Sequence, residues 1–359
     1  MGNIVDYVKD HGNQTMTERA FNELDALVLS EFVYMKWEHI IPRLEEGRDS
    51  LSLKQMKNLM ESEELYGEVF MDERYADDHR ALFDAMLLSK RFGSMKCNYL
   101  VEDKSKDIET QFFAITVFLK GALPVMVFRG TDETMLGWKE DFNMAYKSPV
   151  PGQRLASLYI KQVALRLSGG FVTTGHSKGG NLAVYSVLTA PDGLADRVMR
   201  IYDFDGPGFK NATRLKHDYD RIKDKVCKIV PESSIVGVIL EHPGTYRAVT
   251  STAKGAFQHN PYSWVVNDGD FEYVDDVKPA SRLFRDAITT WMDELSPMEL
   301  ETVFGTIYDI IATTGAETTI ELRKDKKAPV NMLKALIDLP EDTKERMKAL
   351  FKELKNQIQ

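Results

Sequence analysis

Residues 169–181 read Gly-Gly-Phe-Val-Thr-Thr-Gly-His-Ser-Lys-Gly-Gly-Asn, and this stretch decides the fold that the sequence predicts. Its β-branched run is typical of a buried parallel strand, and the residues after it have their apolar side chains at helical spacing. A G-x-S-x-G turn between a strand and a helix holds its serine in a strained conformation, with the hydroxyl above the sheet. Gly175 and Gly179 let the strand and the helix approach closely. We therefore predict that Ser177 is a nucleophile, and the alternative is a glycine-rich turn without chemistry.

The amide that follows the serine adds to this prediction. Lys178 stands at the start of the predicted helix, where unpaired N–H groups and the helix dipole favour a negative charge. We therefore expect the Lys178 amide to donate a hydrogen bond to an oxyanion.

The composition limits the classes of partner. The chain has 359 residues, 43% of them hydrophobic, and a formal net charge of −9. Nucleic acids and anionic membrane surfaces require a concentrated basic face, so neither is the expected partner. Cys97 and Cys227 are too few for a disulfide framework or a metal cluster, and we expect no metal or organic cofactor. Because no leader or membrane-spanning stretch is recognisable, we expect a cytoplasmic protein.

Secondary-structure patterns divide the chain into three parts. Residues 1–93 have helical patterns and carry no recognisable chemistry. Residues 94–277 begin with a hairpin and then alternate strands with helices, which is typical of a mostly parallel sheet covered on both faces. Residues 278–359 are helical again. We predict an α/β fold with helical N- and C-terminal additions, packed together as one unit.

Three segments resemble the class 3 lipases, an α/β-hydrolase family. They are Val127-Phe-Arg-Gly-Thr-Asp, Trp138-Lys-Glu-Asp-Phe and Gly175-His-Ser-Lys-Gly-Gly-Asn-Leu-Ala, and the similarity is closest over residues 110–210. The chain as a whole resembles a bacterial family of lipase-like proteins. The resemblance implies the α/β-hydrolase fold, and it implies that the F-R-G-T segment supplies a donor to the oxyanion.

The residues of these motifs lead to three further expectations. Thr131 follows a strand and a glycine, so its amide and hydroxyl are expected to face the pocket opposite the Lys178 amide and to complete an oxyanion hole. Arg129 and Asp132 are expected to form a structural ion pair that holds the turn. Lipases usually have Leu at the position of Lys178, so a lysine there favours a carboxylate or phosphate on the substrate over a strongly apolar one.

The base is expected after Ser177, because the order in α/β-hydrolases is serine, acid, histidine. His259 lies in a loop between two strand-like segments, where this fold presents its base. His242 follows an apolar segment and is the second candidate, while His217 lies in a charged helical run. His176 is expected to point away from the nucleophile. We therefore predict that His259 is the base.

The acid is less directly indicated. Class 3 lipases carry Asp after the next-to-last core strand, but Ser234 stands at the matching position here. Asp205 ends the preceding strand and resembles the acid of pancreatic-type lipases, and Asp203 lies on the same side of that strand. We predict that Asp205 is the acid, with Glu232 as the fallback.

These residues together predict a serine hydrolase that transfers an acyl group to Ser177 and then to water. The expected substrate is a small-molecule or lipid-like ester, thioester or amide. The alternative is a non-catalytic binding or scaffold protein that kept the fold and lacks a complete triad. The sequence leaves the oligomeric state open.

Overall fold

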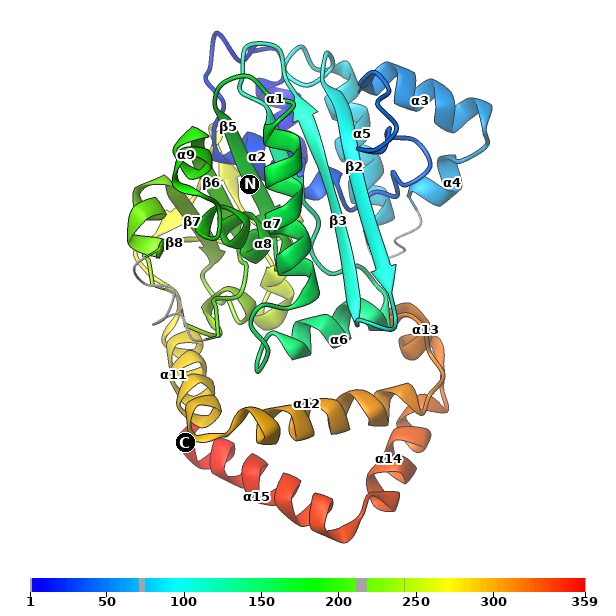
Figure 1. Ribbon diagram of the computed structural model, residues 1–359, viewed down its shortest axis with the longest axis vertical. Coiled ribbons are helices and arrows are strands. Elements are labelled where there is room, and N and C mark those ends of the chain that lie inside the picture. The colour runs from blue at the N-terminus through cyan, green and yellow to red at the C-terminus, as the bar shows by residue number, and fades with distance from the viewer. Residues whose placement is uncertain (1, 71–74, 211–217, 242, 359) are drawn as a thin grey trace.

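A nine-stranded sheet forms the centre of the residues that the computed structural model describes, namely 2–70, 75–210, 218–241 and 243–358 (Figure 1). Its strand order is β1-β2-β3-β4-β5-β6-β7-β8-β11. The strands are β1 (Leu51–Ser52), β2 (Lys96–Ser105), β3 (Thr110–Phe118), β4 (Val125–Phe128), β5 (Phe171–His176), β6 (Val198–Phe204), β7 (Val226–Pro231), β8 (Arg247–Val249) and β11 (Tyr273–Val274). Strands β9 (Val266–Asn267) and β10 (Asp270–Phe271) form a separate hairpin.

The middle of the sheet is parallel, from β4 through β8, and both of its edges are antiparallel. β5 is buried along its whole length, as expected for a parallel strand covered on both faces. Because β4 to β7 run in the same direction, their carboxyl ends lie at one edge of the sheet. Functional side chains of open α/β sheets collect at that edge.

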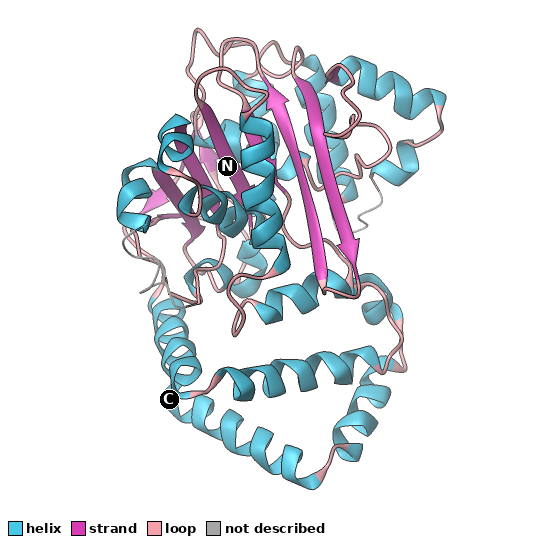
Figure 2. Ribbon diagram, viewed as in Figure 1, coloured by secondary structure: helices cyan, strands magenta, loops and turns pink. Residues whose placement is uncertain are grey.

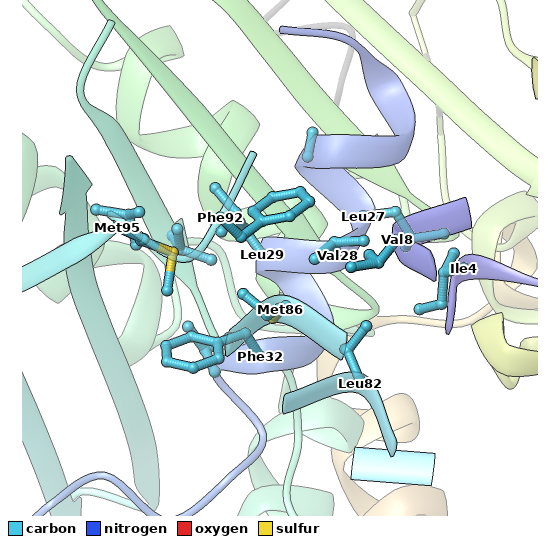
Figure 3. Close-up of a cluster of buried hydrophobic side chains, with 14 of the residues drawn as sticks. Ile4, Val8, Leu27, Val28, Leu29, Phe32, Leu82, Met86, Phe92 and Met95 are labelled. Carbon is cyan, nitrogen blue, oxygen red and sulfur yellow. The ribbon is translucent and has the colours of Figure 1, made fainter. Parts of the chain in front are cut away.

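Helices cover both faces of the sheet, as Figure 2 shows. Those before the C-terminal region are α1 (Ile4–His11), α2 (Glu23–Phe32), α3 (Leu53–Ser62), α4 (Tyr66–Val69), α5 (Ala76–Leu88), α6 (Met135–Asn143), α7 (Pro151–Ala164), α8 (Lys178–Leu188) and α9 (Asp192–Arg197). Alternate side chains of β3 pack on opposite faces of the sheet. Phe113 and Ile115 join the core of α1, α2 and α5, which Figure 3 shows around Leu27 and Met86. Phe112 joins the core of α7 and α8. This arrangement is the α/β-hydrolase fold that the sequence predicted.

The region predicted to be purely helical, residues 1–93, also contributes a strand. Leu51 pairs with Cys97 and Ser52 with Lys96, so β1 extends the antiparallel edge. Two residues are too short to show an alternating pattern in the sequence.

The C-terminal helices extend away from the sheet (Figure 1). They are α11 (Pro279–Glu294), α12 (Pro297–Ala312), α13 (Thr319–Lys324), α14 (Ala328–Asp338) and α15 (Glu341–Ile358). Helix α12 lies against α6, where the rings of Phe304 and Phe142 stack with centroids 5.7 Å apart. The backbone of residues 317–319 pairs with that of residues 133–135, through hydrogen bonds of 2.9 Å from Met135 N to Glu317 O and from Thr319 N to Glu133 O. These contacts join the C-terminal region to the start of α6.

Candidate active site

The turn between β5 and α8 holds Ser177 in a strained conformation. Its φ is +58° and its ψ is −133°, in a region that favours glycine, and a non-glycine residue there costs about 1–3 kcal/mol. A Cβ on Gly175 would lie 2.2 Å from the backbone of Gly179, so only glycine allows the strand and helix to approach this closely. The turn therefore has the geometry of a nucleophile elbow.

His259 lies beside the serine hydroxyl. It ends a short 3₁₀ helix (Gly255–His259), and its Nε2 is 2.9 Å from Ser177 Oγ. The buried Gln258 anchors this loop, because its side-chain oxygen accepts from Ser233 N at 2.6 Å. Its backbone carbonyl accepts from the indole N–H of the buried Trp264 at 2.7 Å. The preceding residue in the chain, Gln258, thus fixes the position of His259.

Asp205 follows β6 and completes a hydrogen-bonded chain. Its Oδ2 is 2.7 Å from His259 Nδ1, and the residue is fully buried. Its other oxygen accepts hydrogen bonds from the Ser234 hydroxyl and, at 3.1 Å, from Gly237 N. Ser234, at the position where class 3 lipases carry the acid, therefore contacts the carboxylate of Asp205.

The other predicted acids and bases have different surroundings. Asp203 forms a buried ion pair with Lys228 at 2.9 Å and accepts from Gly206 N. Glu232 pairs with Lys278 at 2.9 Å. His217 and His242 lie outside the described residues.

His176 contacts His259, which the sequence did not predict. The two rings have centroids 4.7 Å apart, and His176 Nε2 donates to the His259 carbonyl at 2.9 Å. Burial, together with the charge of His259, lowers the pKa of His176 to about 3, so its ring is neutral at physiological pH. Its Nδ1 lies 3.2 Å from Glu31 Oε1 on α2. A contact between a turn residue and a loop more than 80 residues later leaves no pattern in the sequence.

The segment after β4 lies against the serine. A Cβ on Gly130 would be 2.6 Å from the His176 carbonyl and 3.1 Å from Ser177 Cβ, so glycine brings the chain close here. Neither the amide of Thr131 nor that of Lys178 has a hydrogen-bond acceptor within the described parts of the chain. Both amides are therefore available on the two sides of the elbow.

The Thr131 hydroxyl does not serve the pocket as expected. It donates to the carboxylate of Asp141 on α6, with distances of 2.6 and 2.8 Å to the two oxygens. Burial raises the pKa of Asp141 to about 6, although the Lys178 ammonium and the Thr131 hydroxyl oppose this rise. The hydroxyl thus fixes Thr131 in place and leaves the amide as the donor that could reach a ligand.

The Lys178 side chain also differs from the expectation. It is 1% exposed, and its ammonium lies 2.8 Å from Glu140 Oε2 and 2.9 Å from the Gln111 carbonyl. Glu140 also accepts from Gly152 N at 2.7 Å and from the Thr110 hydroxyl at 2.9 Å. The ammonium is therefore held in a buried network and does not project into the mouth of the site, which gives no support to the expectation that it favours an anionic substrate group.

The expected pair of Arg129 and Asp132 is replaced by other contacts. Arg129 pairs with Glu38 at 2.9 Å, and its guanidinium lies 3.9 Å from the ring centroid of Phe113. Asp132 instead accepts from Thr134 N at 2.9 Å, and the charge of Arg129 lowers its pKa against the effect of burial. Both side chains hold the turn, but through different partners.

A cavity of about 390 Å³ opens at Ser177 and His259. Its apolar lining comes from α6 and the residues after it, from the segments after β6 and β7, from α11 and from α12. These residues are Trp138, Phe142, Met144, Ala145, Pro207, Ile235, Val236, Ile239, Leu240, Phe284, Ile288, Met292 and Phe304. Glu31, Tyr34, Tyr75 and His79 add a polar part. Because its lining is largely apolar, the cavity could hold an apolar part of a ligand whose reacting atom lies at Ser177.

Within the described ranges, no group of three or more His, Cys, Asp or Glu side chains is arranged to hold a metal ion. None of the helices described is both long enough and apolar enough to span a bilayer.

Comparisons with known proteins bear on residues of this site. The sequence model of a protein family described as Mbeg1-like matches residues 86–309, which include Ser177, Asp205 and His259. Among solved structures, the crystal structure of M37 lipase is similar with 18% sequence identity and a TM-score of 0.37, covering 62% of this chain and 71% of the lipase chain. The curated proteins include no match.

Proposed function

The chain belongs to the Mbeg1-like family, and we propose that it is a serine hydrolase that cleaves apolar, lipid-like esters through an acyl intermediate on Ser177. The observation that carries the proposal is the hydrogen-bonded chain at the elbow. Ser177 Oγ lies 2.9 Å from His259 Nε2, and His259 Nδ1 lies 2.7 Å from Asp205 Oδ2. These are the distances that a nucleophile, its base and an orienting acid require.

The reaction would follow from these contacts. His259 Nε2 takes the hydroxyl proton while Ser177 Oγ bonds to the carbonyl carbon, and the amides of Thr131 and Lys178 donate to the resulting oxyanion. When the tetrahedral intermediate collapses, the leaving alcohol takes the proton from His259. Water then repeats the two steps and releases the acid. Asp205 keeps the imidazole oriented and stabilises its positive charge.

The cavity supports an apolar acyl group. Its lining between α6, α11 and α12 is largely apolar, and the nearby Lys178 ammonium is already paired with Glu140. An acyl chain held there would place its ester carbonyl at the serine.

The experiment is labelling with a fluorophosphonate probe, which reacts with activated serines. We expect the parent chain to be labelled on Ser177, and the Ser177→Ala and His259→Ala variants to remain unlabelled with the fold retained. An unlabelled parent chain that is folded would contradict the proposal and favour the non-catalytic binding protein. That alternative assumed that the triad lacks its acid. The hydrogen bond between Asp205 and His259 supports the hydrolase over the binding protein.

A further inference from the structure

Helix α14 has an apolar face that the other described residues leave exposed. Val330, Leu333, Leu336 and Ile337 are 53%, 56%, 46% and 59% exposed. Their spacing of three and four residues places them along one side of the helix. Single exposed apolar residues are common on soluble proteins, but an adjacent row of four on one helix indicates an interaction surface.

Basic residues precede α14 along the chain, and one more lies on the helix itself. Arg323, Lys324, Lys326, Lys327 and Lys334 are all exposed. The acidic residue among positions 323–334 is Asp325, and its carboxylate accepts a hydrogen bond from the Lys327 amide at 2.8 Å. From position 323 to the end of α14, five basic residues thus stand against two acidic ones, Asp325 and Asp338, in a chain whose net charge is −9. The sign of the charge is locally reversed beside the apolar face.

We propose that α14 and the basic residues before it dock onto the surface of an anionic membrane. The apolar row would enter the headgroup region, and the basic side chains would bind lipid phosphates, as in interfacial amphipathic helices. Figures 1 and 2 show α14 at the outer edge of the molecule, far from the sheet. The net charge of −9 argued against an anionic membrane as a partner. A net charge is a sum over the whole chain, so it does not reveal a short basic segment.

A second copy of the chain is a poorer occupant for two reasons. One face of an 11-residue helix offers far less than the about 800 Å² per partner of a stable interface. Two copies would also bring five basic residues against five others, and like charges repel at close range.

Binding to vesicles tests this proposal separately from catalysis. The full-length Ser177→Ala chain would be sedimented with phosphatidylcholine vesicles, with and without about one-third phosphatidylglycerol, at low and high salt. We expect it to sediment with the anionic vesicles at low salt, and much less with the neutral ones or at high salt. Because the variant lacks the nucleophile, the result does not depend on hydrolysis.

Three variants of that chain locate the surface. Leu333→Glu with Ile337→Glu should weaken binding at least about tenfold, because charges replace the apolar row. Lys326→Glu with Lys327→Glu should weaken binding to anionic vesicles by about tenfold or more. Leu165→Glu is the matched control, since Leu165 is 87% exposed at the end of α7, and it should bind like the parent. Thermal unfolding verifies that each variant is folded.

Several results would overturn the proposal. One is that the parent chain stays in solution in the presence of anionic vesicles. Another is that Leu165→Glu loses as much binding as the α14 variants. A dimer detected by light scattering without vesicles, and dissociated by the Leu333 and Ile337 substitutions, would assign the face to a second copy instead.

Discussion

At the scale of single residues, Asp205 is held by partners on both of its oxygens, with His259 on one and Ser234 and Gly237 on the other. Asp205→Asn should lower kcat about 10⁴-fold with little change in KM, because an amide cannot stabilise the imidazolium and favours the wrong tautomer. The measurement is kcat on one activated ester. A loss below about tenfold, with the fold intact, would remove Asp205 from the mechanism.

Ser234 provides the matched comparison. Its hydroxyl contacts Asp205, so Ser234→Ala should cost far less activity than Asp205→Asn. The sequence predicted the acid at the end of the earlier strand, on a resemblance to pancreatic-type lipases and not on any pattern that shows which strand end faces the histidine. That choice depends on how the loops after β6 and β7 close over each other, and loop closure has no periodic pattern.

The raised pKa of Asp141 predicts that the stability of the fold depends on pH. Its pKa is raised to about 6 from the usual 3.8, so between these pH values the folded protein keeps a proton that the unfolded chain releases. The stability from this group is therefore largest at low pH and is lost as pH rises towards 6. Asp141→Asn removes the titration and keeps an acceptor for Thr131. The melting temperature of the variant relative to the parent should rise between about pH 4 and pH 6 and then stay constant, and a difference independent of pH would contradict this.

At the scale of elements, the turn between β5 and α8 stores strain at Ser177. Ser177→Gly and Ser177→Ala both remove the hydroxyl, but glycine adopts a φ of +58° without strain. We expect Ser177→Gly to be more stable than Ser177→Ala by about 1 kcal/mol, measured by urea unfolding, while neither variant reacts with the fluorophosphonate probe. Equal stabilities would show that the turn is not strained.

The start of α8 is held to α6 by the buried pair of Lys178 and Glu140. Lys178→Leu introduces the residue usual in lipases, but it leaves the Glu140 carboxylate buried without its cation, which typically costs about 3–5 kcal/mol. Lys178→Leu combined with Glu140→Gln should recover part of this loss in unfolding experiments. An unchanged stability in the single variant would contradict the importance of the pair.

The sequence predicted the elements with strong patterns more reliably than those without. Phe171–Thr174 is apolar and β-branched and lies in β5, and the start of α12 at Pro297 follows a capping box of Ser296 and Glu299. The short α13 (Thr319–Lys324) has no apolar periodicity, so its bounds within the helical region 278–359 were not predicted. Its position depends on the backbone pairing of residues 317–319 with residues 133–135, which is a tertiary contact that no local pattern encodes.

At the scale of the whole molecule, the C-terminal helices complete the cavity. Ile288 of α11 lines it beside Phe284 and Met292. Ile288→Trp should fill part of the space for an acyl chain, and it should lower kcat/KM for long relative to short esters by about tenfold or more. A series of esters with increasing chain length measures this ratio. Thr290→Trp on the exposed side of α11 is the control, and an equal effect in both variants would exclude Ile288 from the acyl site.

The backbone pairing of residues 133–135 with residues 317–319 also sets an order of events on the ribosome. At about 5–20 residues per second, roughly ten to forty seconds separate the synthesis of the two segments. The elbow, Asp205 and His259 are all synthesised within that interval. During this time residues 133–135 cannot yet pair with residues 317–319, which have not been made. Under the proposed function, the Lys178 side of the oxyanion hole would be made before the Thr131 side has its backbone partner. Full reactivity under the proposed function would therefore require synthesis as far as residue 319.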